Sequence, residues 1–315
     1  MQLSNKLLSS NKLTYVVGEN IEQVKLRDYL KYTENLSGRF LKSSGLNGKI
    51  SVNDKVAKLN HRVSSKDKIE IDMKSNEHQN IEPEKMDLDV VYDDVDLIVI
   101  NKSPGIVVHP TKGYPYGTLA NGVSYYFKER HEKCIVRLVS RLDMDTSGLI
   151  IIAKNQFAHM ALARDMQSKD MQSKTFEKSY MAVVHGNMQN KSGTIDLPIG
   201  KPNEEGAKRE VWEEGQRSIT HYEVIKSFKN GDLVKLILET GRTHQIRVHL
   251  SHIGHPIYGD SLYGSEENHY IERQALHAYK LIIPHPRTGE ELILETELPL
   301  DIENLIIKLK AESDI

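Results

Sequence analysis

The stretch SRLDMDTSGLIIIA at residues 140–153 joins a polar turn to a short apolar run. The run at 149–153 has the length of one strand, and its lack of alternation is typical of a strand buried on both faces. The turn places Arg141 and Asp143 two residues apart at the entrance to that strand. Such a position holds a side chain rigidly while leaving it open to a cleft. The stretch therefore predicts a buried strand and a candidate site beside it.

Two other interpretations of this turn compete with a site. Asp, Thr, Ser and Gly are ordinary turn residues, because short polar side chains bond nearby backbone and glycine tolerates positive φ. Asp143, Asp145 and Ser147 also match the first half of a calcium-binding loop. That loop closes with a bidentate glutamate, whereas Lys154 stands at the closing position, where a cation would repel calcium. A plain turn stays open on composition alone, and calcium is set aside.

The overall composition bounds the class of protein. The chain has 315 residues, enough for one large domain and one small one, and its 38% hydrophobic and 27% charged residues are ordinary for a soluble protein. No apolar run approaches the ~20 residues of a membrane helix, and the N-terminus lacks a signal-peptide core. We therefore expect a cytoplasmic protein without membrane association, and a monomer.

Cysteine usage and charge distribution narrow the function classes. The single cysteine, Cys134, excludes an internal disulfide and a cysteine-based zinc site, and no neighbouring motif would activate its thiol. The net charge is only −2, yet residues 1–80 carry 14 Lys and Arg against 9 Asp and Glu. The basic surplus of the N-terminal part favours nucleic acid as its partner.

Residues 13–75 are predicted to form a compact basic αβ module. Ser37 is a suitable N-cap for a helix at 38–44 that carries Arg39 and Lys42. The other elements predicted here are a strand at 13–17, a helix at 21–32, a short strand and turns at 46–55 and a closing strand at 68–73.

The layout of this module resembles the S4-type RNA-binding domain. The resemblance rests on a leucine-containing helix followed by LSGRFLK, GKISVNDK and an IEI strand. It implies that Arg39 and Lys42 contact RNA. The alternative is a generic αβ module whose cations are merely solvated.

The remainder of the chain is predicted to be a linker at 76–87 followed by one larger domain at 88–312. Strand signals outnumber helix signals and do not alternate regularly with them, which favours an α+β fold with a mixed, largely antiparallel sheet over a Rossmann fold. Strands are expected at 90–92, 97–101, 149–153, 180–185, 220–226, 233–239, 277–283 and 292–296, and helices at 157–169, 244–253 and 302–311.

The segment DMQSK occurs twice in succession, at 165–169 and 170–174. Five residues turn a helix by ~500°, so the two copies cannot present the same face of one straight helix. One copy is expected to bulge or to lie beyond the helix end.

Five motifs in this larger domain together resemble the RluA/RluD-type pseudouridine synthases. They are NKSPGIVVHP at 101–110, SRLDMDTSGL at 140–149, EKSYMAVVHG at 177–186, TGRTHQIRVHLSHIGHPIYGD at 240–260 and ALHAYKLIIPHPRTGE at 275–290. The resemblance implies a catalytic domain with a central cleft that detaches uracil from the ribose of an RNA uridine and rejoins it through carbon 5. This sequence departs from the family pattern at two positions. Ser140 stands where histidine is common, and Pro104 comes one place later than the proline of the family's Lys-Pro-x-Gly motif.

The resemblance also assigns roles to single residues. Asp143 matches the catalytic aspartate, and Tyr180 matches the tyrosine that stacks on the flipped base, although alone it reads as a strand aromatic. Arg247 would keep Asp143 ionised, because a cation within ~4 to 6 Å lowers the pKa of a desolvated carboxyl group. Arg141 would enter the RNA stack vacated by the base or, alternatively, contact phosphate. Arg242 and His244 are expected to contact phosphate or to cap a helix.

No metal or cofactor is expected. His244, His249, His252 and His255 invite a zinc interpretation, but they lack the HExxH pattern and a nearby cysteine. The sequence therefore predicts a pseudouridine synthase acting on structured RNA, either ribosomal RNA of the large subunit or transfer RNA. The alternative from another class is a catalytically silent RNA-binding or ribosome-assembly protein on the same fold.

Overall fold

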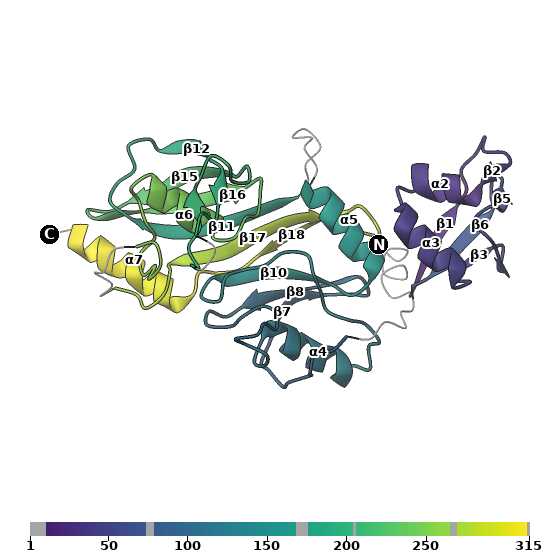
Figure 1. Cartoon of the computed structure of the whole chain (residues 1–315), viewed down its shortest axis with the longest axis horizontal. Coiled ribbons are helices and arrows are strands. Elements are labelled where there is room, and N and C mark those ends of the chain that lie inside the picture. Colours follow the sequence, from purple (N-terminus) through teal and green to yellow (C-terminus); the bar gives the residue numbers. More distant parts are fainter. Residues whose placement is uncertain (1–10, 74–78, 168–175, 204–205, 265–269, 314–315) are drawn as a thin grey trace.

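The computed structural model describes residues 11–73, 79–167, 176–203, 206–264 and 270–313. In these ranges the chain is an α+β protein whose sheets are largely antiparallel, which confirms the predicted fold class. A small N-terminal unit lies at one end of the molecule and a large sheet carries the rest (Figure 1). Within the described ranges, no helix combines the length and the apolar composition that a membrane span needs.

The N-terminal module, residues 11–73, has its own four-stranded sheet and its own apolar core. Ser37 caps α3 as expected, because its side chain accepts a hydrogen bond from the Phe40 amide at 3.1 Å. The elements of the module are β1 (Lys12–Val16), β2 (Val24–Lys25), α2 (Leu26–Tyr32), α3 (Gly38–Leu46), β3 (Ile50–Val52), β4 (Lys55–Val56), β5 (Arg62–Val63) and β6 (Lys68–Asp72).

The helix expected at 21–32 is shorter than predicted. It begins only at Leu26, because Gln23 has a left-handed backbone with φ of 54° that a right-handed helix cannot include. The next two residues form β2, in which Val24 lies opposite Val63 of β5. The apolar pattern that indicated a longer helix therefore came partly from a strand.

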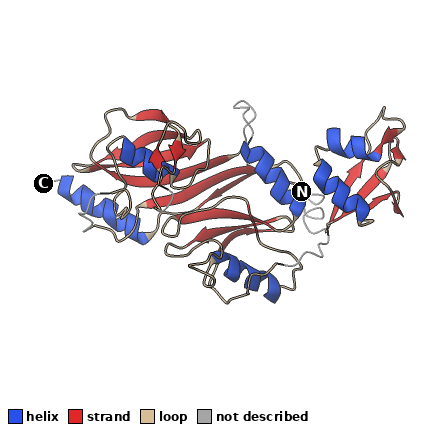
Figure 2. Cartoon of the chain, viewed as in Figure 1, coloured by secondary structure: helices blue, strands red, loops and turns tan. Residues whose placement is uncertain are grey.

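The rest of the chain is organised on a ten-stranded sheet with the main order β12-β15-β16-β11-β17-β10-β8-β7. Its strands run through the middle of the molecule, with helices on its outside (Figure 2). The strands are β7 (Asp89–Asp93), β8 (Leu97–Lys102), β9 (Arg137–Leu138), β10 (Ser147–Ala153), β11 (Glu177–His185), β12 (Ser192–Asp196), β15 (Ile219–Ser227), β16 (Gly231–Leu238), β17 (Leu276–Pro284) and β18 (Glu291–Glu295), and β13 (Ile199–Gly200) pairs separately with β14 (Glu210–Val211).

Strand β10, which contains the apolar run of the opening stretch, is buried along its whole length. Ile150 and Ile152 pack with α4 (Leu119–Glu129) on one face, whereas Leu149 and Ile151 pack with α5 (Gln156–Gln167) on the other. The other helices of the domain are α6 (Gln245–His252) and α7 (Leu300–Ser313), which cover β11 and β16. The continuous apolar run is thus explained by burial on both faces.

Helix α4 is an element that the sequence analysis missed. Thr118 and Asn121 form a capping box at its N-terminus, and Leu119, Val123 and Phe127 are buried on one side. The segment expected as a linker at 76–87 packs against this helix where it is described, since Asn121 Nδ2 donates to the Glu82 carbonyl at 2.8 Å. The second DMQSK copy and the end of the first lie outside the described residues.

Candidate active site

A cleft of about 1770 Å³ opens on the large sheet and contains the turn from the opening stretch. Its walls come from the loop after β8, the segment before β10, the start of β11 and the loop between β16 and α6. Six cationic side chains line it, at Arg141, Lys178, Arg209, Arg217, Arg242 and Arg247, against three acidic ones at Asp143, Asp196 and Glu239. The excess of positive charge suits an anionic ligand.

Asp143 is paired with Arg247, as predicted from the sequence. Arg247 Nη1 donates to Asp143 Oδ2 at 3.0 Å. The same guanidinium binds Asp260 in a bidentate manner, through Nε at 2.7 Å and Nη2 at 2.8 Å. Asp260 is fully buried, whereas 26% of the Asp143 side chain is exposed. The buried carboxylate therefore orients the guanidinium, and the partly exposed one faces the cleft.

The charges of this triad are stabilised by one another. Burial disfavours the charge on Arg247, but the hydrogen bonds and charges of Asp260 and Asp143 outweigh it and raise the pKa of the guanidinium. Burial likewise favours a protonated Asp260, but Arg247 and the amides of Tyr263 and Leu262 lower the pKa of that carboxyl group. The site thus holds a permanent cation against the carboxylate in the cleft.

Gly148 fixes the turn to the sheet. Its φ of 111° lies in the region that favours glycine, and a Cβ there would collide with the Ala278 backbone of β17. Strands β10 and β17 run parallel at this point, with Gly148 opposite Ala278. The close approach of two backbones explains why glycine ends the polar part of the opening stretch.

Tyr180 reaches the cleft from a β-bulge between β11 and β17. Ser179 pairs with Lys280 and Met181 with His277, so two residues of β17 lie opposite Tyr180. A bulge of this kind re-aims a side chain next to a site. Burial and then the negative charge of Asp143 raise the pKa of the Tyr180 phenol, which keeps its proton at neutral pH.

Lys102 holds the turn that contains Asp143 in place, and the sequence analysis did not predict this role. It is 1% exposed, and its Nζ donates to the Met144 carbonyl at 2.7 Å and to the carbonyls of Ser103 and Ile106. Arg273 holds the same turn through the Asp145 carbonyl at 3.0 Å. Burial lowers the pKa of the Lys102 amine to about 7. Two buried basic side chains, Lys102 and Arg273, therefore fix the backbone on the C-terminal side of Asp143.

His244 belongs to the site more closely than the sequence indicated. It is the N-cap residue of α6, but its side chain makes no capping bond. Its Nε2 lies 3.9 Å from Asp143 Oδ1, and its Nδ1 shares a hydrogen bond with the Tyr263 hydroxyl at 2.9 Å. Burial lowers the pKa of His244, although Asp143 acts in the opposite direction. His244 thus occupies the capping position without a side-chain capping bond, and its contact with phosphate stays a prediction.

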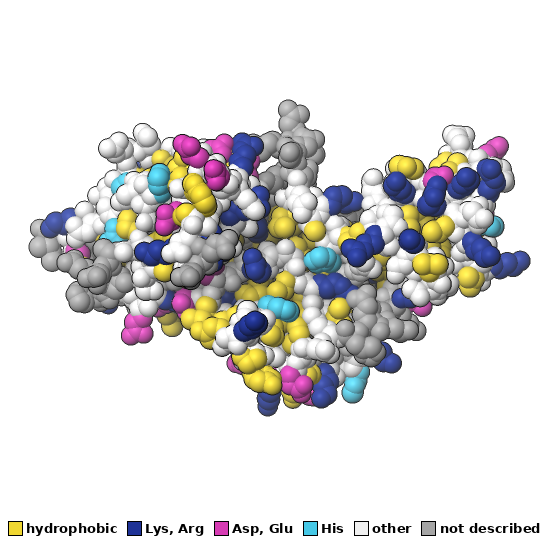
Figure 3. Space-filling view, viewed as in Figure 1, with side chains coloured by type: hydrophobic (Ala, Val, Ile, Leu, Met, Phe, Trp, Pro, Cys, Tyr) yellow, Lys and Arg dark blue, Asp and Glu magenta, His cyan; other side chains and the backbone are white. Residues whose placement is uncertain are grey.

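The other expected RNA-contacting residues lie on accessible surface. Arg141 and Arg242 are exposed in the cleft wall, and Arg39 and Lys42 are exposed on α3 of the N-terminal module. In the view of Figure 3, Lys and Arg side chains gather over the N-terminal module. Contacts of these four residues with RNA remain predictions.

The four histidines that invited a zinc interpretation do not converge. His249 bonds Thr220 Oγ1 and the Leu197 carbonyl, whereas His255 Nδ1 bonds the His185 carbonyl. Among the described residues, no group of three or more His, Cys, Asp or Glu side chains could hold a metal ion.

Lys154 and Cys134 both have structural surroundings that account for them. Lys154, at the closing position of the calcium-like pattern, bonds Glu132 at 2.7 Å and pairs with Asp93. The half-buried Cys134 lies beside the apolar core around α4, and burial raises the pKa of its thiol to about 12. A thiol with that pKa is unreactive at neutral pH.

Sequence reasoning did not identify Asp260 as a residue of the site. Aspartate is usually exposed and is fully buried only when it is paired, so a buried position was not expected from the sequence. The signal was available, since Asp260 ends the same motif that contains Arg247. Tyr263 was also missed, and its ring lies 5.1 Å from the Arg247 guanidinium carbon. The cation of the site therefore rests on an aromatic face as well as on two carboxylates.

Comparison with known proteins places this site in a family. The sequence profile described as RNA pseudouridylate synthase matches residues 96–252, which include Asp143, Tyr180 and Arg247. The chain is 37% identical to the RNA pseudouridine synthase YlyB of Bacillus subtilis over 95% of its own length and 99% of that protein. It is 34% identical to ribosomal large subunit pseudouridine synthase D of Yersinia pestis over 98% and 96% of the two chains.

A solved structure shares the fold of a large part of this chain. Human RNA pseudouridylate synthase domain containing 4 superposes with a TM-score of 0.57 at 24% identity, covering 70% of this chain and 92% of that one. The motifs, the fold and the extent of the sequence matches agree. The chain belongs to the RluA/RluD family of RNA pseudouridine synthases, which are isomerases.

Proposed function

We propose that this protein converts specific uridines of large-subunit ribosomal RNA to pseudouridine, with Asp143 as the catalytic carboxylate. The observation that carries this proposal is the pairing of Asp143 with Arg247 in a cleft that Tyr180 also lines. The ribosomal substrate is supported by the likeness to the Yersinia pestis enzyme, whose name specifies the large ribosomal subunit.

The chemistry requires a carboxylate that stays charged when RNA excludes water. The reaction breaks the bond between ribose carbon 1′ and uracil nitrogen 1 and forms a bond from carbon 1′ to carbon 5. Carbon 5 loses its proton to solvent and nitrogen 1 gains one, so the product is an isomer of the substrate. An ionised carboxylate can capture or stabilise the sugar while the base turns. Arg247 is a cation 3.0 Å from Asp143, so it stabilises the charged form of this carboxylate when bound RNA excludes water.

The target base must leave the RNA stack to reach Asp143. Arg141 lies two residues before Asp143 on the exposed wall of the cleft, where its guanidinium can occupy the vacated place in the stack. Tyr180 presents an aromatic ring on which the flipped uracil can stack and a hydroxyl that can approach carbon 5. Arg242 and His244 complete the contacts around the nucleotide.

The N-terminal module adds to the affinity for RNA. Arg39 and Lys42 of α3 are exposed, and phosphate contacts of this kind provide affinity without reading sequence. A monomer acting on one structured RNA needs no further subunit for these contacts. Transfer RNA is the second candidate substrate for the same chemistry.

The proposal is tested by release of tritium from RNA labelled at uridine carbon 5. A large-subunit ribosomal RNA transcript should release tritium with the wild-type protein and not with Asp143→Asn, which keeps the shape of the side chain but loses its charge. Mapping pseudouridines in the ribosomal and transfer RNA of a strain lacking the gene then identifies the target. If wild type bound the RNA without releasing tritium from either class, the silent RNA-binding alternative would hold.

A further inference from the structure

The N-terminal module is in contact with the large domain through helix α5. The Phe40 and Phe157 ring centroids are 6.3 Å apart, and Phe157 is buried in the apolar core of the module. Ser37 Oγ lies 3.5 Å from Met160 Sδ. Nearby, Arg164 Nη1 donates to the Asn35 carbonyl at 3.3 Å. The segment that precedes α3 and the start of α3 therefore rest on one side of α5.

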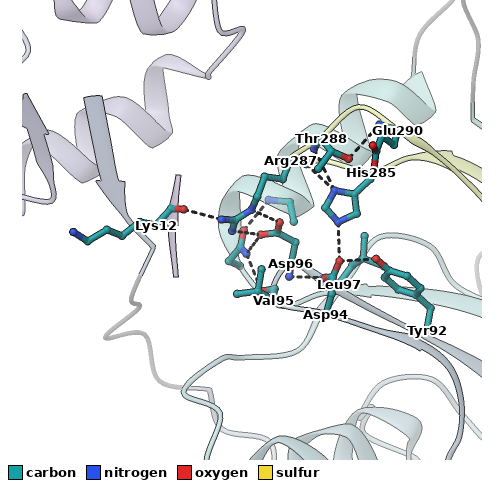
Figure 4. A network of polar contacts seen from close by, with 12 residues as sticks. Lys12, Tyr92, Asp94, Val95, Asp96, Leu97, His285, Arg287, Thr288 and Glu290 are labelled. Atoms are coloured by element: carbon teal, nitrogen blue, oxygen red, sulfur yellow. Dashed lines mark hydrogen bonds and ion pairs between the residues drawn. The ribbon is translucent and has the colours of Figure 1, made fainter. Parts of the chain in front are cut away.

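A second contact is made by Arg287, in the turn between β17 and β18. Its Nη1 donates to the backbone carbonyl of Lys12, in β1 of the module, at 2.7 Å. The rest of its guanidinium binds Asp96 in a bidentate manner, at 2.7 and 2.9 Å (Figure 4). The Arg287 side chain is only 4% exposed and Asp96 is fully buried.

The turn that carries Arg287 is itself fixed by polar contacts. His285 Nε2 lies 2.7 Å from Asp94 Oδ2, and the Tyr92 hydroxyl donates to the same carboxylate at 2.8 Å (Figure 4). Because Asp96 and the turn hold the guanidinium within the large domain, its Nη1 atom is already aimed at β1. A pre-organised fork loses little side-chain entropy when it forms a further hydrogen bond.

Helix α5 also borders the cleft. Met166 and Gln167 at its C-terminal end line the cleft, whereas Met160 contacts the module. Met160 and Met166 are six positions apart in this helix, which corresponds to ~9 Å along the axis. The module is thus docked close to the edge of the cleft, with Arg39 and Lys42 exposed on α3.

We infer that the N-terminal module docks on α5 and Arg287 before RNA binds, so that α3 and the cleft form one preset surface for a single structured RNA. This inference rests on the proposed function for the identity of the ligand. Arg287 is a positioning residue in this arrangement, because it acts on the module and not on the reacting nucleotide. The preset distance between α3 and Asp143 would restrict which uridines of a folded RNA can enter the cleft.

The first test is Arg287→Lys, which keeps a cation against Asp96 but lacks a planar fork for two partners. We measure tritium release from a short hairpin transcript that fills only the cleft and from a long large-subunit transcript that also reaches the module. The variant should raise KM for the long RNA roughly 10-fold or more, as expected when a tethered second site loses its fixed position. KM for the hairpin and kcat for both RNAs should stay unchanged. Equal KM values of wild type and variant on the long RNA would overturn the positioning role.

The second test locks the docked arrangement. Gly38→Cys and Arg164→Cys place exposed thiols on α3 and α5, and a Cβ at Gly38 meets no atom within 4 Å. A short bis-maleimide should cross-link the two within the RNA-free chain, and the cross-linked protein should keep its KM for the long RNA. The single-cysteine variants are the controls.

Three results would contradict the inference or its basis in distinguishable ways. Reaction of both thiols with a monofunctional maleimide, but no intramolecular cross-link, would show that the module is not docked. A cross-linked protein that no longer binds the long RNA would show that the docked arrangement is not the one used. Failure of the wild type to release tritium would overturn the proposed function, while the cross-link would still report on docking.

Discussion

Arg247 Nη1 lies 3.0 Å from Asp143 Oδ2, although the two residues are 104 positions apart in the chain. The other side of the guanidinium is occupied by Asp260, which is fully buried. One permanent cation is therefore shared by a carboxylate that orients it and a carboxylate that faces the cleft. Removal of the cation should affect folding and catalysis through different partners.

Arg247→Met should lower the free energy of unfolding by about 3 to 5 kcal/mol, because it leaves Asp260 charged and buried without a partner. Urea denaturation measures this loss. Arg217→Met is the matched control, since its pair with Asp196 is 74% and 47% exposed, and water screens such a pair so that its loss should leave stability nearly unchanged. Equal stability of the two variants would mean that Asp260 does not depend on Arg247.

Tyr180→Phe should separate the ring of this residue from its hydroxyl. Phenylalanine keeps the aromatic face, so RNA affinity should be retained, whereas tritium release should slow by about 10²-fold or more if the hydroxyl takes part in proton transfer at carbon 5. Tyr180→Leu should lower both the RNA affinity and the rate of tritium release, because it removes the aromatic ring together with the hydroxyl. Binding is measured by filter retention and release in single-turnover assays, and a Phe variant with the wild-type rate would leave only the stacking role.

Gly148→Ala should destabilise the protein strongly, because its φ of 111° disfavours any Cβ and the new methyl group would meet the Ala278 backbone. The expected fall in melting temperature is larger than for any exposed glycine. Gly113→Ala is the control, since a Cβ there meets no atom within 4 Å. If the two variants had the same melting temperature, β10 and β17 would be able to move apart without loss of stability, and the prediction would be wrong.

His277 should make the protein less stable in mild acid. Its Nδ1 lies 2.9 Å from Ser147 Oγ, and burial, with a further contribution from Arg273, lowers its pKa to about 4. The unfolded imidazole binds a proton near pH 6.5, so between pH 6.5 and 4 the unfolded state holds more protons and stability falls as the pH falls. The loss from this group should reach about 3 kcal/mol at pH 4.

Urea denaturation at pH 7, 5.5 and 4.5 measures this dependence. His277→Asn keeps a polar group opposite Ser147 but does not titrate, so its stability should change less over the same interval. His249, whose pKa is also lowered by burial, will leave part of the slope in place. A slope identical to wild type would show that folding does not lower the pKa of His277.

The fold class and the pairing of Asp143 with Arg247 could be predicted from the sequence. The apolar run of β10 indicated a doubly buried strand. The family resemblance assigned Asp143 and Arg247 to one site, and the charge requirement of a desolvated carboxylate then indicated that the two are paired. Helix α4 was missed because Asn121 and Gly122 are poor helix formers in its first turns, and tertiary burial of Leu119 and Phe127 overrides that preference.

Other features depend on contacts that no local pattern encodes. The pairing of Lys102 with the Met144 carbonyl joins segments 42 positions apart, and a lysine followed by a turn is normally read as solvated. The bulge opposite Tyr180 arises from the register of two strands that are far apart in sequence. The roles of Asp143, Tyr180 and Arg247 in the reaction remain proposals that the experiments above address.

The burial of Cys134 has a practical consequence for fluorescent labelling of this protein. A thiol whose pKa is raised to about 12 remains protonated at neutral pH, so it should resist maleimide dyes without being replaced. Cysteines introduced at exposed positions can then carry a donor and an acceptor fluorophore in an otherwise native chain. Energy transfer between them would follow single molecules through substrate capture and product release.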